Sequence, residues 1–78
     1  MDRKTKDINL LTMYLNGWEE ESRKEPGDKI LRVWKGYPFQ IINELEKESF
    51  IRQYARSLII TKEGQSRAEG LKHYYLRT

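Results

Sequence analysis

The chain has 78 residues, 35% of them charged, no cysteine and a net charge of +3. This length suits one small domain, the absence of cysteine excludes disulfides and thiolate metal sites, and no apolar run reaches the roughly 20 residues of a membrane-spanning helix. We expect a single domain over residues 1–78, cytoplasmic and without a membrane partner, in which residues 1–5 are flexible.

Apolar residues recur at helical spacing near the start of the chain, at Ile8, Leu11, Leu15 and Trp18. They predict a first helix over residues 6–22 with one buried apolar stripe and with Asp7 in its first turn. If the stripe is core, Leu15→Ala should cost about 2–5 kcal/mol. The turn signal Pro26-Gly27 then predicts an exposed loop over residues 23–29.

A short apolar run follows the loop, at Ile30, Leu31, Val33 and Trp34. It is too short to separate a strand from a helical turn, so residues 30–37 stay open between the two. Pro38 suits the first turn of a helix, because its missing N–H needs no partner there. Phe39, Ile42 and Leu45 continue that central helix to Glu48.

The last third of the chain predicts a hairpin and a terminal helix. Phe50-Ile51 begins one strand, and Leu58 to Ile60 forms the other, with Leu58 and Ile60 on one side and Ile59 opposite. Thr61 is a helix N-cap, followed by Glu63 in the first turn. The buried stripe of this terminal helix is expected at Ala68, Leu71 and Tyr75.

These elements resemble two families. Leu45-Glu46, Phe50-Ile51, Leu58, Ile60-Thr61 and Glu63-Gly64 resemble winged-helix transcription regulators of the MarR and PadR type. Leu10 to Leu15, the R-x-W-K-G-aromatic motif from Arg32 to Tyr37, and Ser57 to Gly64 resemble a small family of uncharacterised bacterial proteins.

The resemblance implies a small winged-helix-like α+β domain of three helices, with a two-stranded β-hairpin wing between the last two. The helix-turn-helix would be truncated or absent, since only residues 30–37 lie where the regulators have a further helix. The resemblance also implies a left-handed turn at Ser49, where the regulators usually have glycine.

Double-stranded DNA is the first candidate partner. The start of the central helix offers Lys35, Tyr37 and Gln40, of which lysine suits guanine or phosphate and glutamine suits adenine. The wing adds Arg52 and Arg56, and these could form a basic strip with Lys35 and Lys62. A solvated basic surface is the plainer interpretation of the same charges.

A protein-interaction or dimerisation module without DNA contact is the alternative function. Aromatic side chains are favoured in interfaces, although both tryptophans are expected to be core residues. Tyr74 and Tyr75 are adjacent in the terminal helix, so only one can face the core, and the other could join a homodimer through that helix.

No catalytic activity is expected. His73 is the only histidine, no cysteine can replace a second one, and neither of the usual phosphate-binding glycine motifs occurs. The sequence therefore predicts no catalytic residue, no metal, no cofactor and no small-molecule ligand.

Overall fold

The computed structural model describes residues 2–77. Within them lie three helices and four strands: α1 (Arg3–Asn16), β1 (Trp18–Glu21), β2 (Lys29–Trp34), α2 (Phe39–Lys47), β3 (Ile51–Gln53), β4 (Ser57–Ile60) and α3 (Lys62–Leu76). The α+β class and the three helices are confirmed. Residues 3–5 belong to α1, and Asp2 caps this helix by accepting a hydrogen bond from the Thr5 amide at 2.8 Å.

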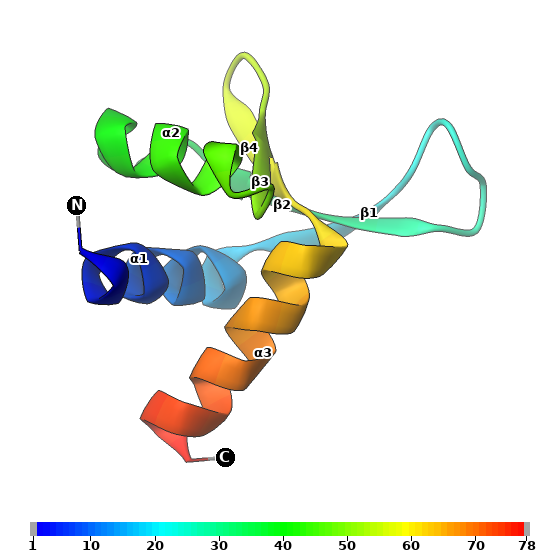
Figure 1. Cartoon of the computed structure of the whole chain (residues 1–78). Helices are drawn as coiled ribbons and strands as arrows, with labels where there is room; N and C mark the ends of the chain where they lie inside the picture. Colours follow the sequence, from blue (N-terminus) through cyan, green and yellow to red (C-terminus); the bar gives the residue numbers. More distant parts are fainter. Residues whose placement is uncertain (1, 78) are drawn as a thin grey trace.

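The strands form one antiparallel sheet in the order β1-β2-β4-β3 (Figure 1). Residues 29–34 are therefore a strand, which resolves the alternative left open by the sequence. The predicted hairpin of β3 and β4 is present, but the expected two-stranded wing is wrong, since β4 also pairs with β2 through Leu31↔Ile60 and Val33↔Leu58. The hairpin is half of a larger sheet.

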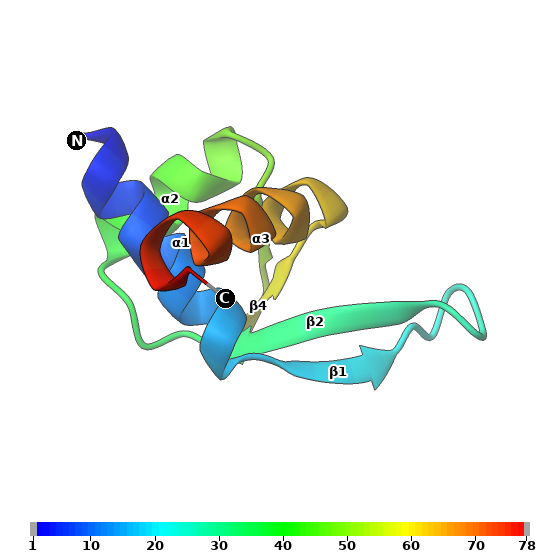
Figure 2. The same cartoon turned by 90° about the horizontal axis from the view of Figure 1, so that it is seen from below.

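The first helix is shorter than predicted, because residues 18–21 form β1. Gly17 ends α1, and a Cβ atom there would meet Val33 Cγ2 at 2.9 Å and the Arg32 carbonyl oxygen at 3.1 Å. The chain leaves this close contact in an extended conformation and pairs with β2. The β1–β2 hairpin runs out to one side of the molecule while the helices gather on the other (Figures 1 and 2), and the loop between its strands is mostly exposed, as predicted.

One hydrophobic core lies between the helices and the inner face of the sheet. The sheet contributes alternate residues, Val33, Ile51, Leu58 and Ile60, and the helices contribute Leu10, Met13, Ile41, Ile42, Leu45 and Ala68. The predicted side preference in β4 is confirmed, since Leu58 and Ile60 are buried and Ile59 only partly so. The predicted stripe of α1 is wrong at Ile8 and Leu15, which are 43% and 51% exposed, because α1 packs through Leu10, Leu11 and Met13.

The start of α3 is held against the end of α2. The Thr61 hydroxyl accepts a hydrogen bond from the Gly64 amide at 3.0 Å, which confirms the predicted N-cap, and it donates to the Ser49 carbonyl at 2.6 Å. Ser49 has a φ of 66°, so the predicted left-handed turn is also confirmed. Farther along α3, Ala68 is fully buried and Leu71 half-buried, but Tyr75 is 38% exposed and does not complete the predicted stripe.

Ion pairs connect α1 to the other two helices. Asp7 was predicted in the first turn of α1, but it lies beyond that turn. It is buried and accepts hydrogen bonds from Arg67 of α3 (2.8 Å to Nη2) and from Arg3 (3.0 Å to Nε). Glu48, at the end of α2, binds Arg3 and Lys6. The first helix is thereby fixed to both of its neighbours.

Candidate functional site

The outer face of the sheet points away from the core and carries aromatic and basic side chains, several of them exposed. Strand pairing aligns Trp18, Arg32, Ile59 and Arg52 in one row across all four strands. A second row joins Trp34, Ser57 and Tyr54, since Trp34 pairs with Ser57 and the Tyr54 amide donates to the Ser57 carbonyl at 2.9 Å. These two rows, with Glu20 and Ile30, are called the outer face below.

Arg32 lies at the centre of the outer face and is held by three groups. Its Nε donates to Glu20 at 2.9 Å, its Nη1 donates to the Ser57 hydroxyl at 2.8 Å, and its guanidinium lies 5.6 Å from the centre of the Tyr54 ring. The Trp18 indole N–H donates to the same Glu20 carboxylate at 2.7 Å. Hydrogen bonds from Trp18 and Arg32 lower the pKa of Glu20, so this carboxylate stays ionised and offsets the charge of Arg32.

The two tryptophans meet on this face. Their ring centroids are 5.1 Å apart and their planes are inclined by 48°. Trp34 sits diagonally from Trp18 across β1 and β2, where large side chains can pack and stabilise strand register. That role accounts for Trp18, which is half-buried with its N–H bonded. Trp34 is 65% exposed, so the prediction that both tryptophans are core residues is wrong.

The predicted DNA-contacting residues fall into three places. Arg52 lies on the outer face, and Lys35 and Arg56 adjoin the second row, where the Lys35 amide donates to the Arg56 carbonyl at 3.4 Å. Lys62 opens α3 and pairs with Asp28 at 3.8 Å. Tyr37 packs partly against the core and Gln40 is exposed on α2. The structure thus brings Lys35, Arg52 and Arg56 to the outer face and its border.

Charge is unevenly divided among the strands. Residues 18–21 include three glutamates, whereas residues 29–35 and 51–60 hold five basic residues and no acidic one. Among the ion pairs of the described residues, none involves Lys35, Arg52 or Arg56. The positive charge of the sheet therefore lies on β2, on β3 and just after these two strands, close along the chain to the exposed residues Trp34 and Tyr54.

A broad open groove extends from the outer face toward the β1–β2 loop and the start of α3. Ile30, Arg32, Arg52, Tyr54 and Ile59 line one part of it. The rest is lined by the loop residues and by the residues around Lys62, with basic and acidic side chains in equal numbers over the whole groove. The loop end of the groove is thus less attractive to an anion than the end near Arg52.

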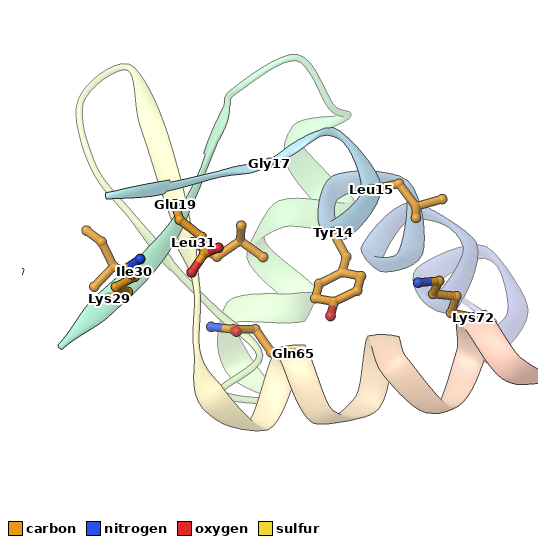
Figure 3. A pocket seen from close by; sticks show the side chains of 9 residues that line it. All are labelled: Tyr14, Leu15, Gly17, Glu19, Lys29, Ile30, Leu31, Gln65 and Lys72. Carbon is orange, nitrogen blue, oxygen red and sulfur yellow. The ribbon is translucent and has the colours of Figure 1, made fainter. Parts of the chain in front are cut away.

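A second hollow lies on the opposite side of the sheet, between α1, the β1–β2 hairpin and α3. Figure 3 shows Tyr14 reaching toward α3 there, with Gln65 and Lys72 on either side. The Tyr14 hydroxyl binds Glu69, and this hydrogen bond raises the pKa of Tyr14. The hydroxyl therefore stays protonated and already has a partner.

In residues 2–77, no group of three or more histidine, cysteine, aspartate or glutamate side chains is placed to hold a metal ion. None of the described helices is long and apolar enough to cross a membrane. His73 is exposed on α3.

The sequence analysis missed Arg32, Trp34 and Tyr54 as parts of one surface. Alternation along residues 29–34 would have put Arg32 and Trp34 on one side, but only once that segment was known to be a strand. Their neighbours on β3 and β4 follow from strand pairing, which the sequence alone does not give.

A comparison with family models matches residues 1–78, the whole chain, to a family described as "Domain of unknown function (DUF6429)". No curated protein and no solved structure matches the chain. The expected membership of a small uncharacterised family is confirmed, whereas the resemblance to winged-helix regulators gains no support from these comparisons.

Proposed function

For a chain that belongs to the DUF6429 family, we propose that the outer face of the sheet binds nucleic acid. One observation carries the proposal: Lys35, Arg52 and Arg56, which form no ion pairs within residues 2–77, each lie within two residues along the chain of an exposed ring, that of Trp34 or Tyr54. Basic side chains bind phosphates and aromatic rings stack on bases, so this combination on one open surface suits a nucleic acid.

The arrangement of charge supports this choice over an acidic protein surface as the partner. The two basic groups that border the second row, Lys35 and Arg56, are brought together by a backbone hydrogen bond between their residues. Arg52 stands two residues before Tyr54 on the same strand side. Repeated positive charges spaced along a row of flat rings match the repeating phosphates of a nucleic acid strand.

Nucleic acid could instead contact the start of α2. Reading of a DNA duplex by this helix would use Gln40, with Tyr37 and Lys35 leading into it. Gln40 is exposed, whereas Tyr37 is already partly committed to the core. Binding at the outer face and binding at α2 predict contacts at different residues, because Arg52 lies on the sheet and Gln40 on α2.

The test is an NMR amide-shift titration with generic oligonucleotides at about 50 and 200 mM salt, a range over which phosphate-driven binding weakens strongly. Salt-sensitive shifts at Arg52, Tyr54 and Arg56 are expected. The double variant Arg52→Gln/Arg56→Gln should bind more weakly and lose about one to two units of the slope of log K against log salt.

The matched control is Lys4→Gln/Lys47→Gln, which removes the same charge from exposed positions on α1 and α2. This control should bind like the parent protein. Absence of shifts at low salt, or equal loss of affinity in both double variants, would overturn the proposal. Shifts centred on Gln40 would instead assign the contact to α2.

The second candidate function is homodimerisation through the terminal helix, and exposed apolar residues at its end favour it. Tyr74 is 75% exposed and lies edge-on to Tyr75, with 4.9 Å between ring centroids, and Leu76 is 48% exposed. Sedimentation equilibrium measures the monomer–dimer equilibrium directly. A dimer that dissociates in Tyr74→Ser supports the candidate, and a parent protein that is monomeric at every concentration removes it.

A further inference from the structure

We infer that the outer face takes an unpaired nucleic acid strand whose bases stack on Trp34 and Tyr54, rather than a duplex. This inference rests on the proposed function and names its ligand class. It follows from how the aromatic and basic side chains are ordered across the strands.

The rings of Trp34 and Tyr54 are open to a ligand. Trp34 is 65% and Tyr54 49% exposed, so both retain a large open surface after their contacts with Trp18 and Arg32. Every base has a π-face that can stack on such a ring, which is why stacking platforms suit single strands of varied sequence. In a duplex those faces are already covered by the neighbouring base pairs.

The spacing of Trp34 and Tyr54 suits an unpaired strand better than a duplex. Trp34 and Tyr54 flank Ser57 in the second row, one on β2 and the other directly after β3. Because neighbouring strands lie about 4.8 Å apart, the two ring-bearing positions are roughly 10 Å apart. Adjacent bases in a duplex are separated by about 3.4 Å along the axis and cannot spread to fit two such platforms. An unpaired strand can.

Basic residues on both sides of the second row could bind the phosphates of such a strand. The second row is bordered on one side by the row that contains Arg52 and on the other by Lys35, which follows β2, and by Arg56 in the β3–β4 turn. Bases on the rings would therefore have basic side chains on both sides. Arg32, whose charge Glu20 offsets, holds the Tyr54 ring and Ser57 in place rather than serving as a free cation.

The two tryptophans are the only ones in the chain, so intrinsic fluorescence reports on this face directly. We would titrate the whole protein at about 50 mM salt with a thymidine oligomer of about 12 nucleotides, with an abasic strand of the same length and with a duplex of the same length. The thymidine oligomer should quench the fluorescence and bind at least about fivefold tighter than either of the others.

Comparison of the three ligands distinguishes nucleic acid binding in general from stacking of unpaired bases. If none of the three ligands binds, the proposed function itself fails. If the abasic strand or the duplex binds as tightly as the thymidine oligomer, phosphate binding stands and stacking of unpaired bases is overturned. Tight binding of the thymidine oligomer alone supports both.

Variants give a second readout, measured as anisotropy of a dye-labelled thymidine oligomer. Trp34→Leu and Tyr54→Leu should each weaken binding about fivefold or more, and Trp34→Phe should retain most of the affinity because it keeps a flat ring. Tyr74→Leu is the control, since it removes an even more exposed ring from the end of α3. Unchanged affinity in a Trp34→Leu protein with a native amide spectrum would contradict the inference.

Discussion

Ser49 shows how a single backbone angle connects two elements. It carries a φ of 66° in the turn between α2 and β3, and its carbonyl accepts the hydroxyl hydrogen bond of Thr61, the residue that caps α3. A left-handed conformation is unfavourable for a residue with a Cβ atom, so the turn is held by its surroundings. The unfavourable backbone conformation of Ser49 is therefore maintained by the contacts where α2, β3 and α3 meet.

Ser49→Gly should raise the free energy of unfolding by about 1 kcal/mol, because glycine adopts this conformation without the Cβ clash. Thermal or urea denaturation measures the change. Arg77→Gly is a useful comparison, since Arg77 also has a positive φ, of 52°, but follows the last turn of α3, where little packing depends on it. A lower stability for Ser49→Gly would mean that the serine side chain contributes more than its backbone costs.

The two glycines of α3 have different reasons to be there. A Cβ atom on Gly64 would lie 2.1 Å from the Phe50 carbonyl oxygen and 2.8 Å from Ile60 Cγ2, so the first turn of α3 approaches the backbone just before β3 at a distance that only glycine allows. A Cβ atom on Gly70 would meet nothing within 4 Å.

Gly64→Ala should therefore destabilise the protein by about 3 kcal/mol or more, since the clash is with backbone and cannot be relieved by a side-chain rotation. Gly70→Ala should instead add about 1 kcal/mol, the usual gain from replacing glycine inside a helix. The two urea midpoints should move in opposite directions. Equal shifts would show that the contact at Gly64 can relax.

Among the elements, those with local signals were predicted and those that depend on partners were not. The β3–β4 hairpin and the cap at Thr61 were found because alternation and capping chemistry act over a few residues. β1 was missed because Trp18 continues the helical spacing of Leu11 and Leu15, and three consecutive glutamates are not typical of a strand. Pairing with β2 overrides that weak local preference.

The misplaced helix stripe leads to a prediction about α1. Leu10 is fully buried, whereas Leu15 is 51% exposed. Leu10→Ala should cost about 2–5 kcal/mol of unfolding free energy, and Leu15→Ala less than about 1 kcal/mol, because only the first leaves a cavity. Chemical denaturation of both variants distinguishes the two faces of the helix. A larger loss at Leu15 would place the core on the stripe predicted from sequence.

Only part of the candidate site was predicted from the sequence, because local patterns indicate a hairpin but not which strands pair with it. Arg52 and Arg56 were identified because the hairpin was identified. Trp34 was expected in the core, since an exposed tryptophan is uncommon and nothing local indicates that β2 turns it outward. The second row brings Trp34 and Tyr54 together only because β2, β4 and the end of β3 pair in a particular register, and that register depends on contacts between residues far apart in the sequence.

For the molecule as a whole, Glu48 joins the end of α2 to α1. It accepts a hydrogen bond of 3.0 Å from Arg3 and pairs with Lys6 at 3.5 Å. The hydrogen bond from Arg3 is the main cause of a lowered pKa at Glu48. A carboxylate whose pKa is lower in the folded state than in the unfolded state stabilises the fold above the unfolded pKa, and this contribution is lost as the pH falls through the folded value.

The unfolding free energy of the parent protein should therefore fall as the pH drops below the ordinary glutamate value of about 4.5. Glu48→Gln should be less stable at pH 7, by up to about 1 kcal/mol, and should show a flatter decline in acid. Urea denaturation at a series of pH values tests this, with Glu25→Gln from the exposed loop as the charge control. Parallel pH curves for parent and Glu48→Gln would contradict the assignment.

The packing of α1 on α3 has a consequence for biosynthesis. Asp7 is paired with Arg67, and Ala68 fills the core beside Leu10 and Met13, so the first helix has no complete partner until the last one has been made. Ribosomes add about 5–20 residues per second, which leaves the apolar side of α1 uncovered for seconds on the nascent chain. During that time it would be a binding site for chaperones, and any truncation before residue 68 would leave it open permanently.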